Sequence, residues 1–145
     1  MKKRKTVMRA VGRARRAWRN HVREIMQAEG IPDSYRTVLM FLNRNPGSGQ
    51  RSIAEFAGVT TSAINQAVKS MLEEDFLRKE VDPTDKRNSR LYLTEKGQDA
   101  AERLICKLDA SDDAITAMLG EEKEAELMAL LDKLADFIGK DLHAC

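Results

Sequence analysis

Residues 50–74 read QRSIAEFAGVTTSAINQAVKSMLEE, and their pattern predicts two short helices joined by a tight turn. In the first, over residues 50–57, apolar residues recur at helical spacing, and Gly58 can take the left-handed conformation that ends a helix. Thr60 can cap the second, which extends to about residue 74. Two helices separated by a linker of about three residues are typical of a helix-turn-helix.

The outer face of the second helix is polar and carries no acidic residue before its last turn. Asn65 and Gln66 are the residue types that can bond bidentately to adenine in a major groove. Thr61 and Ser62 lie in the first turn, where hydroxyls and free N–H groups can hold a phosphate, and Lys69 can reach a phosphate or a guanine. A merely solvated face is the alternative, although such a face would usually include glutamate.

A β-hairpin is predicted directly after this helix. Residues 76–81 and 91–94 are short β-type runs, and a loop over residues 82–90, DPTDKRNSR, joins them. An arginine on a thin loop can enter a minor groove, and Arg87 is the best candidate, with Lys86 and Arg90 nearer the phosphates. Asp85 lies two residues before Arg87 and can hold its guanidinium group in place.

Helices are expected on both sides of this central part. Helical spacing of apolar residues predicts helices over residues 7–26, 95–119 and 121–140, the third beginning after Gly120. A further helix is expected between the first of these helices and the helix-turn-helix, and Asp33 or Ser34 can cap it. The apolar stripes of the first and last helices are long compared with the small central unit that could cover them. The two helices pack either on each other within one chain or, as we favour, against the helices of a second chain.

Composition narrows the function class. The chain has 145 residues and a formal net charge of +2, but residues 1–90 hold 19 Lys/Arg against 10 Asp/Glu, and residues 91–145 hold 6 against 13. Such asymmetry favours a polyanionic partner for the first part. Cys106 and Cys145 are too few for a disulfide framework, and no secretory signal or membrane span is evident, so a cytoplasmic protein is expected. Cys106 falls near the apolar stripe of its helix, which favours a small buried residue.

No enzyme is indicated, because the sequence has no glycine-rich phosphate loop, no Cys-x-x-Cys and no nucleophile elbow. His21 and His143 lie far apart, without other residues at metal-ligand spacing. Paired acids such as Asp112-Asp113 are better explained as complements to a helix dipole than as a metal site. We therefore expect no cofactor and no metal.

At the wing the sequence resembles the multiple-antibiotic-resistance regulator (MarR) family. Asp82, Asp85, Lys86 and Arg87 match the wing pattern of that family, and Leu93-Thr94 with Gly97 matches the Leu-Thr-x-x-Gly that opens its next helix. The stretch Gln50-Arg51-Ser52-Ile53-Ala54 is similar to the start of the first helix of the family's helix-turn-helix. Two departures are Asp75, where the family usually has glycine, and Gly49, where a Ser or Thr cap is common.

The resemblance covers nearly the whole chain and implies a mainly α fold with a small β-hairpin wing, a winged helix-turn-helix. It implies one MarR-like chain over residues 1–145, with the DNA-binding part at 33–94 and dimerisation helices at 1–30 and 95–145. The implied function is a homodimeric, sequence-specific regulator of transcription, expected to be a repressor. Its recognition helix, 61–74, would read the major groove of double-stranded DNA, and its wing, 82–90, the minor groove.

The family also suggests a small-molecule effector. If one exists, Trp18, Tyr35 and Met40 are candidate pocket walls, although each is also explained as plain core. Two alternatives stay open, a winged-helix module that binds an acidic protein and a protein that coats DNA without sequence preference. The expected DNA-binding residues are Thr60, Thr61, Ser62, Asn65, Gln66, Lys69, Asp85, Lys86, Arg87 and Arg90.

Overall fold

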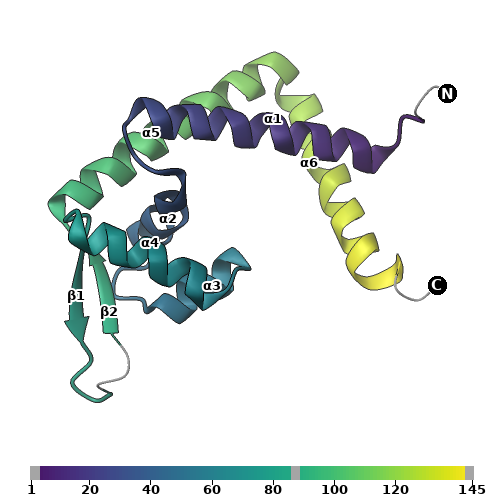
Figure 1. The fold of residues 1–145 in the computed structure, drawn as a ribbon. Coiled ribbons are helices and arrows are strands. Elements are labelled where there is room, and N and C mark those ends of the chain that lie inside the picture. The colour runs from purple at the N-terminus through teal and green to yellow at the C-terminus, as the bar shows by residue number, and fades with distance from the viewer. Residues whose placement is uncertain (1–3, 86–88, 143–145) are drawn as a thin grey trace. The chain divides into compact units, whose positions relative to one another are not determined.

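The computed structural model describes residues 4–85 and 89–142 of the chain. Along it run α1 (Val7–Ala28), the 3-10 turn η1 (Asp33–Tyr35), α2 (Arg36–Arg44), α3 (Gln50–Ala57), α4 (Thr61–Glu73), β1 (Leu77–Val81), β2 (Ser89–Leu93), α5 (Glu95–Leu119), α6 (Glu121–Asp136) and the π-helical turn η2 (Phe137–Asp141) (Figure 1). The chain forms two compact units, residues 1–107 and 108–145, and α5 runs through the boundary between them. The mainly helical fold with one hairpin confirms the predicted class. Within the described residues, no helix is both long and apolar enough to cross a membrane.

The core of the first unit is built from every helix in it. Val38, Leu39 and Leu42 of α2 are buried, and around them lie apolar side chains from the other elements. The largest of these, each under 2% exposed, are Met26, Ile53, Met71, Leu91 and Leu104. Removal of this apolar surface from water is the main force that holds the helix-turn-helix and hairpin together.

The hairpin is antiparallel, with Leu77 opposite Leu93 and Val81 opposite Ser89. Leu77 and Leu91 turn inward and are buried, as the alternation in the sequence predicts. A short bridge between Ser48 and Leu91 adds the segment before α3 to the edge of β2. The base of the wing is thereby attached to the helix-turn-helix.

One joint connects α4, the hairpin and α5. Asp75, at the position where the MarR-type pattern usually has glycine, has a φ of 64° and is left-handed, and the chain then reverses into Phe76. The hydroxyl of Thr94 donates to the carbonyl of Asp75 (2.5 Å) and accepts from the N–H of Gly97 (3.1 Å), so it caps α5 as predicted. A Cβ on Gly97 would lie 2.1 Å from the carbonyl oxygen of Phe76. Only glycine permits this approach of α5 to the start of the hairpin.

Polar contacts connect α5 to the helices before the helix-turn-helix. Glu29, just after α1, pairs with Arg103 (3.0 Å) and with Lys107 of α5. Hydrogen bonds from Lys107 and then from Arg103 hold the pKa of the Glu29 carboxyl below its usual value. Gln98 of α5 donates to the side-chain oxygen of Asn43 of α2 (2.9 Å).

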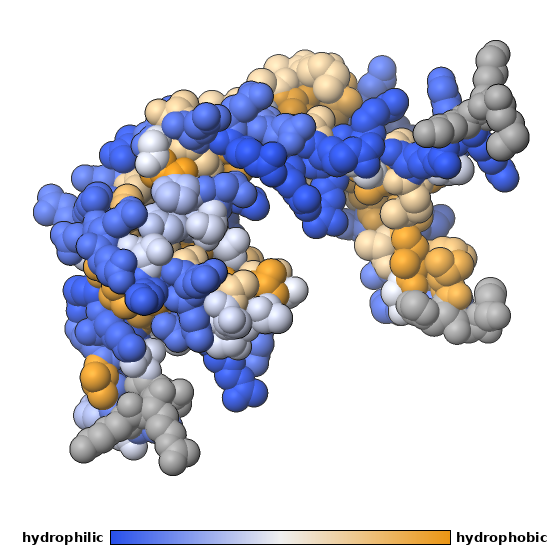
Figure 2. Space-filling view, in the orientation of Figure 1, coloured by the Kyte–Doolittle hydropathy of each residue, from blue (hydrophilic) through white to orange (hydrophobic). Residues whose placement is uncertain are grey.

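In the second unit, none of the described residues of α6 is buried. Its apolar side chains lie on the surface, as Figure 2 shows for α6, with Leu127 43%, Leu130 57% and Phe137 49% exposed. A stripe of this kind usually marks an interaction surface. These exposures agree with the expectation that the apolar stripe of the last helix is longer than one chain can cover.

Three local predictions differ from the structure. Neither Asp33 nor Ser34 caps α2, because η1 precedes it and its N-cap is Tyr35, which makes no side-chain cap. Cys106 is exposed and not buried, since it lies two residues after Leu104 and therefore on the other side of α5 from Ala101 and Leu104, which face the core. Regular α-helix ends at Asp136, and the predicted extension to residue 140 is a π-turn.

Replacement of Gly97 by alanine should lower the free energy of unfolding by about 3 kcal/mol, because the new Cβ overlaps a backbone oxygen that cannot move aside alone. Urea denaturation followed by circular dichroism measures this change. Gly12→Ala is the matched control: its new Cβ meets only the Arg16 side chain, at 3.5 Å, and should stabilise α1 by about 0.5–1 kcal/mol. Equal effects of the two substitutions would contradict the assigned role of Gly97.

Asp75→Gly should raise the free energy of unfolding by about 0.5–1 kcal/mol, because glycine adopts a positive φ without the steric cost of a Cβ. Asp75→Ala keeps the Cβ and loses the local polar side chain, so it should be less stable than the wild type. Thermal unfolding of the three proteins orders them. A wild type more stable than Asp75→Gly would show that the carboxylate makes a compensating contact.

Candidate nucleic-acid interface

The helix-turn-helix forms as the sequence predicts. Gly58 ends α3 with a φ of 65°, which lets the chain turn within three residues. The hydroxyl of Thr60 then accepts from the N–H of Ala63 (3.3 Å) and begins α4. Both signals are local, and for this reason sequence reasoning could find them.

Two faces of α4 have opposite character. Ile64, Ala67, Val68 and Met71 are buried against the core. The predicted contact residues all lie on the other face and are exposed, namely Thr60, Thr61, Ser62, Asn65, Gln66 and Lys69. No acidic side chain occurs in this helix before Glu73, so the face offers hydrogen-bonding groups and one cation to a ligand.

The loop that leaves β1 is organised by Asp82. Its Oδ1 accepts from the backbone N–H of Thr84 (2.9 Å) and from the Thr84 hydroxyl (2.6 Å), which makes a tight local turn. Its other oxygen lies 3.7 Å from a guanidinium nitrogen of Arg90, at the start of the return strand. The Thr84 hydroxyl, followed by the Thr84 N–H, lowers the pKa of the Asp82 carboxyl. Asp82 therefore stays ionised and connects the two sides of the wing.

The wing carries the remaining predicted residues, and the structure places Arg90 in β2 and not in the loop over residues 82–90 that the sequence predicted. Asp85 and Arg90 are exposed. Lys86 and Arg87 lie outside the described residues, so the pairing of Asp85 with Arg87 and the role of Lys86 stay predictions. The pairing of Arg90 with Asp82 was not predicted, because it depends on the register of the two strands.

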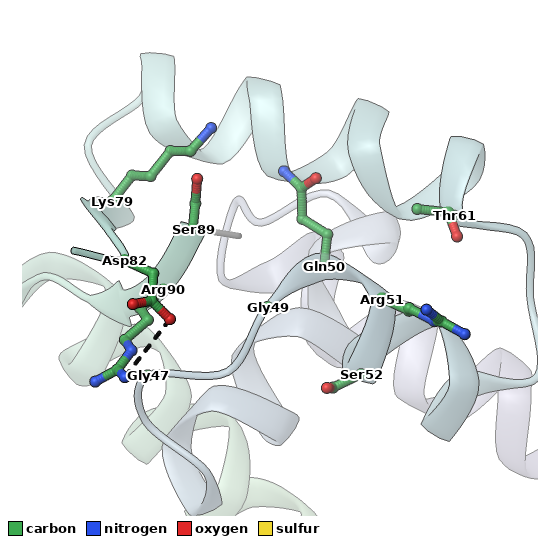
Figure 3. Close-up of a pocket in the computed structure, with 10 residues that line it drawn as sticks. All are labelled: Gly47, Gly49, Gln50, Arg51, Ser52, Thr61, Lys79, Asp82, Ser89 and Arg90. Atoms are coloured by element: carbon green, nitrogen blue, oxygen red, sulfur yellow. Dashed lines mark ion pairs between the residues drawn. The ribbon is translucent and has the colours of Figure 1, made fainter. Parts of the chain in front are cut away.

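A polar hollow of about 510 Å³ connects the helix-turn-helix to the wing (Figure 3). Thr61 and Arg90, which the sequence assigned to separate contacts, both line it. In Figure 3 the side chains of Gln50, Lys79 and Ser89 point toward the same space. Its lining also includes Gly47, Gly49, Arg51, Ser52 and Asp82.

Sequence reasoning did not select the residues at the start of α3. Gly49 caps this helix without a side chain, so the N–H groups of its first turn are not used by a cap. Arg51 is exposed there and pairs with Glu55 one turn later (3.2 Å). A helix start with a basic residue and no acid is a signal for anion binding that could have been read at residues 49–52. Lys79 had no such signal, because only strand pairing turns it toward the hollow.

Beside α4 lies a second hollow of about 410 Å³, lined in part by Gln66, Lys69 and Glu73. Tyr35, next in sequence to Ser34 of its lining, is only 2% exposed, so the structure makes it part of the core. Burial, followed by hydrogen bonding to Glu74, raises the pKa of its hydroxyl. Its ring meets Phe76 edge-on, with centroids 5.5 Å apart. Tyr35 thus supports the end of α4.

The interface as a whole suits a rigid polyanion. Exposed amide and hydroxyl groups on α4 can bond to base edges, and Arg51, Lys79 and Arg90 can meet phosphates on either side. Among the residues that the structure describes, no group of three or more His, Cys, Asp or Glu side chains could hold a metal ion.

Comparison with known proteins agrees with this architecture. A model of the MarR family matches residues 29–88. The HTH-type transcriptional regulator BilQ of Clostridium symbiosum is 28% identical over 120 residues, covering 83% of this chain and 82% of that protein. The uncharacterized HTH-type transcriptional regulator YybA of Bacillus subtilis is 30% identical over 104 residues, covering 71% of this chain and 69% of that protein. In fold, the chain is similar to the transcriptional repressor CouR bound to a 23-mer DNA duplex, with a TM-score of 0.77, 24% identity, and coverage of 90% and 92% of the two chains.

Thr84→Ala should raise the pKa of the Asp82 carboxyl toward its usual value, because it removes the hydroxyl donor and leaves the Thr84 N–H in place. Because the pKa of Asp82 is lowered in the folded chain, the carboxylate stabilises the wing at pH values above its unfolded pKa of 3.8. This stabilisation is lost as the pH falls through the folded pKa. A carboxyl-detected NMR titration measures both proteins. The Glu29 pKa serves as the internal control and should not move.

Proposed function

Because this chain belongs to the MarR family of DNA-binding transcription regulators, we propose that it is a homodimeric repressor that recognises a specific double-stranded DNA sequence. The family consists of transcription regulators and is not an enzyme family. The similar repressor CouR is bound to a DNA duplex, which supports the same partner for this chain. We further propose that it acts in the cytoplasm, without a cofactor.

The outer face of α4 is the observation that carries this proposal. Asn65 and Gln66 are exposed one turn after the helix start, where a recognition helix presents side chains to the major groove. Their amides can donate to N7 and accept from the 6-amino group of adenine. Thr60, Thr61 and Ser62 hold the helix start against a phosphate, and Lys69 meets the backbone or a guanine one turn further on.

The hollow between α3 and the wing is proposed to take the sugar-phosphate backbone. Arg51, Lys79 and Arg90 line it, and the N–H groups of the α3 start lie there without a side-chain cap. Asp82 keeps Arg90 in position by pairing with it. Beyond this hollow, we propose that Arg87 enters the minor groove with Lys86 near its edge and Asp85 as a brace.

The dimer is proposed to form through residues 1–30 and 95–145, with residues 33–94 as the DNA-binding part. Exposed leucines and Phe137 on α6 and η2 support this division, since the described residues of one chain leave Leu127, Leu130 and Phe137 43–57% exposed. A two-fold dimer would bind a pseudopalindrome with half-site centres about 10–10.5 base pairs apart. A small molecule that binds the dimer would release the repressor from its site.

Asn65→Ala should reduce affinity for the specific site by about 1–3 kcal/mol and relax preference at one base position. In vitro selection of bound duplexes identifies the site, and fluorescence anisotropy at fixed salt measures the loss. Asn20→Ala, which removes an exposed amide from α1, is the matched control and should leave the preference at every base position unchanged.

Two results would contradict the proposed function. Binding without any selected sequence would indicate a protein that coats DNA. No binding to any duplex at low salt would indicate a module that binds an acidic protein instead.

A further inference from the structure

The α1 helix carries a density of positive charge that the proposed site does not use. Residues 4–23 hold eight lysines and arginines and no aspartate or glutamate. Seven of the eight are arginine, and all eight side chains are exposed. Hydrophilic residues accordingly cover much of α1 in Figure 2.

These cations lie apart from the apolar side of the helix. Val22 and Met26 are buried, and Val11 and Trp18 are half-buried, so one side of α1 packs on the protein. Arg9, Arg16 and Arg23 recur every seven residues, which is close to two turns, and therefore form a row on the solvent side. At a rise of 1.5 Å per residue the row is about 21 Å long. We call Arg9, Arg16 and Arg23 the arginine row.

No carboxylate among the described residues pairs with any of these eight cations. By contrast, Arg51, Arg90 and Arg103 elsewhere in the first unit each have an acidic partner. Arg9 of the row donates to the backbone carbonyl of Arg4 (3.3 Å), which holds the Arg9 guanidinium group near the helix start. So many like charges repel one another, and this repulsion is relieved when a polyanion binds.

The first turn of α1 adds a concave site to the row. A hollow of about 260 Å³ is lined by Arg4, Lys5, Thr6, Arg9 and Arg13 among others. The hydroxyl of Thr6 caps the helix by accepting from the Arg9 N–H (3.3 Å). Four cationic side chains around one small hollow can surround a phosphate group, and guanidinium groups bind phosphate in a bidentate manner.

We propose that the arginine row and this hollow form a second DNA-binding surface, which contacts the phosphate backbone without reading its sequence. The inference rests on the proposed function only in that duplex DNA is the polyanion the protein meets. It adds a contact made by the helix that otherwise serves dimerisation. The surface strengthens binding to any duplex and raises the number of counterions released, while the preference for one site stays with α4.

A lipid surface is a poorer match. A helix that binds an anionic membrane inserts its apolar side between the lipids. In α1, Val22 and Met26 are buried in the protein and Val11 and Trp18 are half-buried, so only part of the apolar side is open to lipid. A bare phosphate backbone needs only the cationic side, which is open.

The test compares two triple variants that each remove three exposed cations from one helix. Arg9→Gln/Arg16→Gln/Arg23→Gln changes the arginine row, and Lys123→Gln/Lys133→Gln/Lys140→Gln, the α6 variant, changes α6 and the η2 turn that continues it. Fluorescence anisotropy with a random-sequence duplex gives the binding constant of each full-length protein between about 50 and 200 mM salt. The slope of log K against log salt should be smaller by about 0.9 for each phosphate that the variant no longer neutralises, or about 2.7 for three. The ratio of wild-type affinity to variant affinity should therefore be about 40 times larger at 50 mM salt than at 200 mM salt.

The α6 variant should keep the wild-type slope, and both variants should keep the wild-type ratio of affinities for the selected and random duplexes. Equal slopes for the arginine-row variant and the wild type would overturn the proposal. The proposal would also be overturned if the arginine-row variant alone dissociated into monomers in a sedimentation experiment. Its cations would then contact the acidic surface of a second copy instead of DNA. Arginine-dependent binding to phosphatidylserine vesicles with an unchanged DNA slope would assign the surface to lipid.

The two hypotheses fail in different measurements. If the wild type shows no preference for any duplex, the proposed function fails, while the difference in slope still tests α1. If the preference is intact and the slopes are equal, only the second surface is refuted.

Discussion

The contact between the Gly97 backbone and the carbonyl oxygen of Phe76 is the constraint on which the DNA-binding unit depends. It brings α5 against the first residue of the hairpin at a distance that no side chain permits. The same carbonyl accepts from the N–H of Thr94 (3.0 Å), and the Thr94 hydroxyl reaches back to Asp75. The end of α4, the base of the wing and the start of α5 are thereby joined at one point. A recognition helix and a wing can bind one duplex only if their separation is fixed, and this joint fixes it.

Charge in the first unit is arranged around this frame. On the wing and on α5, cations pair with carboxylates that orient them, as Asp82 does for Arg90 and Glu29 for Arg103. On α4 the contact face is uncharged apart from Lys69, so it can bind through directional hydrogen bonds. On α1 the cations are dense and lack carboxylate partners among the described residues. Paired cations suit contacts of defined geometry, and unpaired ones suit a contact that depends on charge alone.

The acidic part of the chain differs in a way that matches its proposed role. Residues 91–145 hold 13 acidic residues against 6 basic ones, and α6 exposes its leucines. Negative charge would weaken a surface that faces DNA, but it keeps an apolar dimerisation surface selective and soluble. Separating the two charges along the chain therefore separates the two kinds of interaction.

Sequence alone determined the elements whose signals are local. Gly58, Thr60 and Thr94 each fix a helix end within four residues, and alternation in 77–93 fixes the hairpin. It also placed Asn65, Gln66 and Lys69 on the exposed side of α4, since that follows from helical spacing. It failed at α2, where a 3-10 turn replaced the expected cap, and at Cys106, whose exposure depends on which side of α5 packs. Only the tertiary structure joined Arg51, Lys79 and Arg90 around one hollow and paired Arg90 with Asp82, because these residues meet through strand register and helix packing, and neither leaves a periodic trace in the chain.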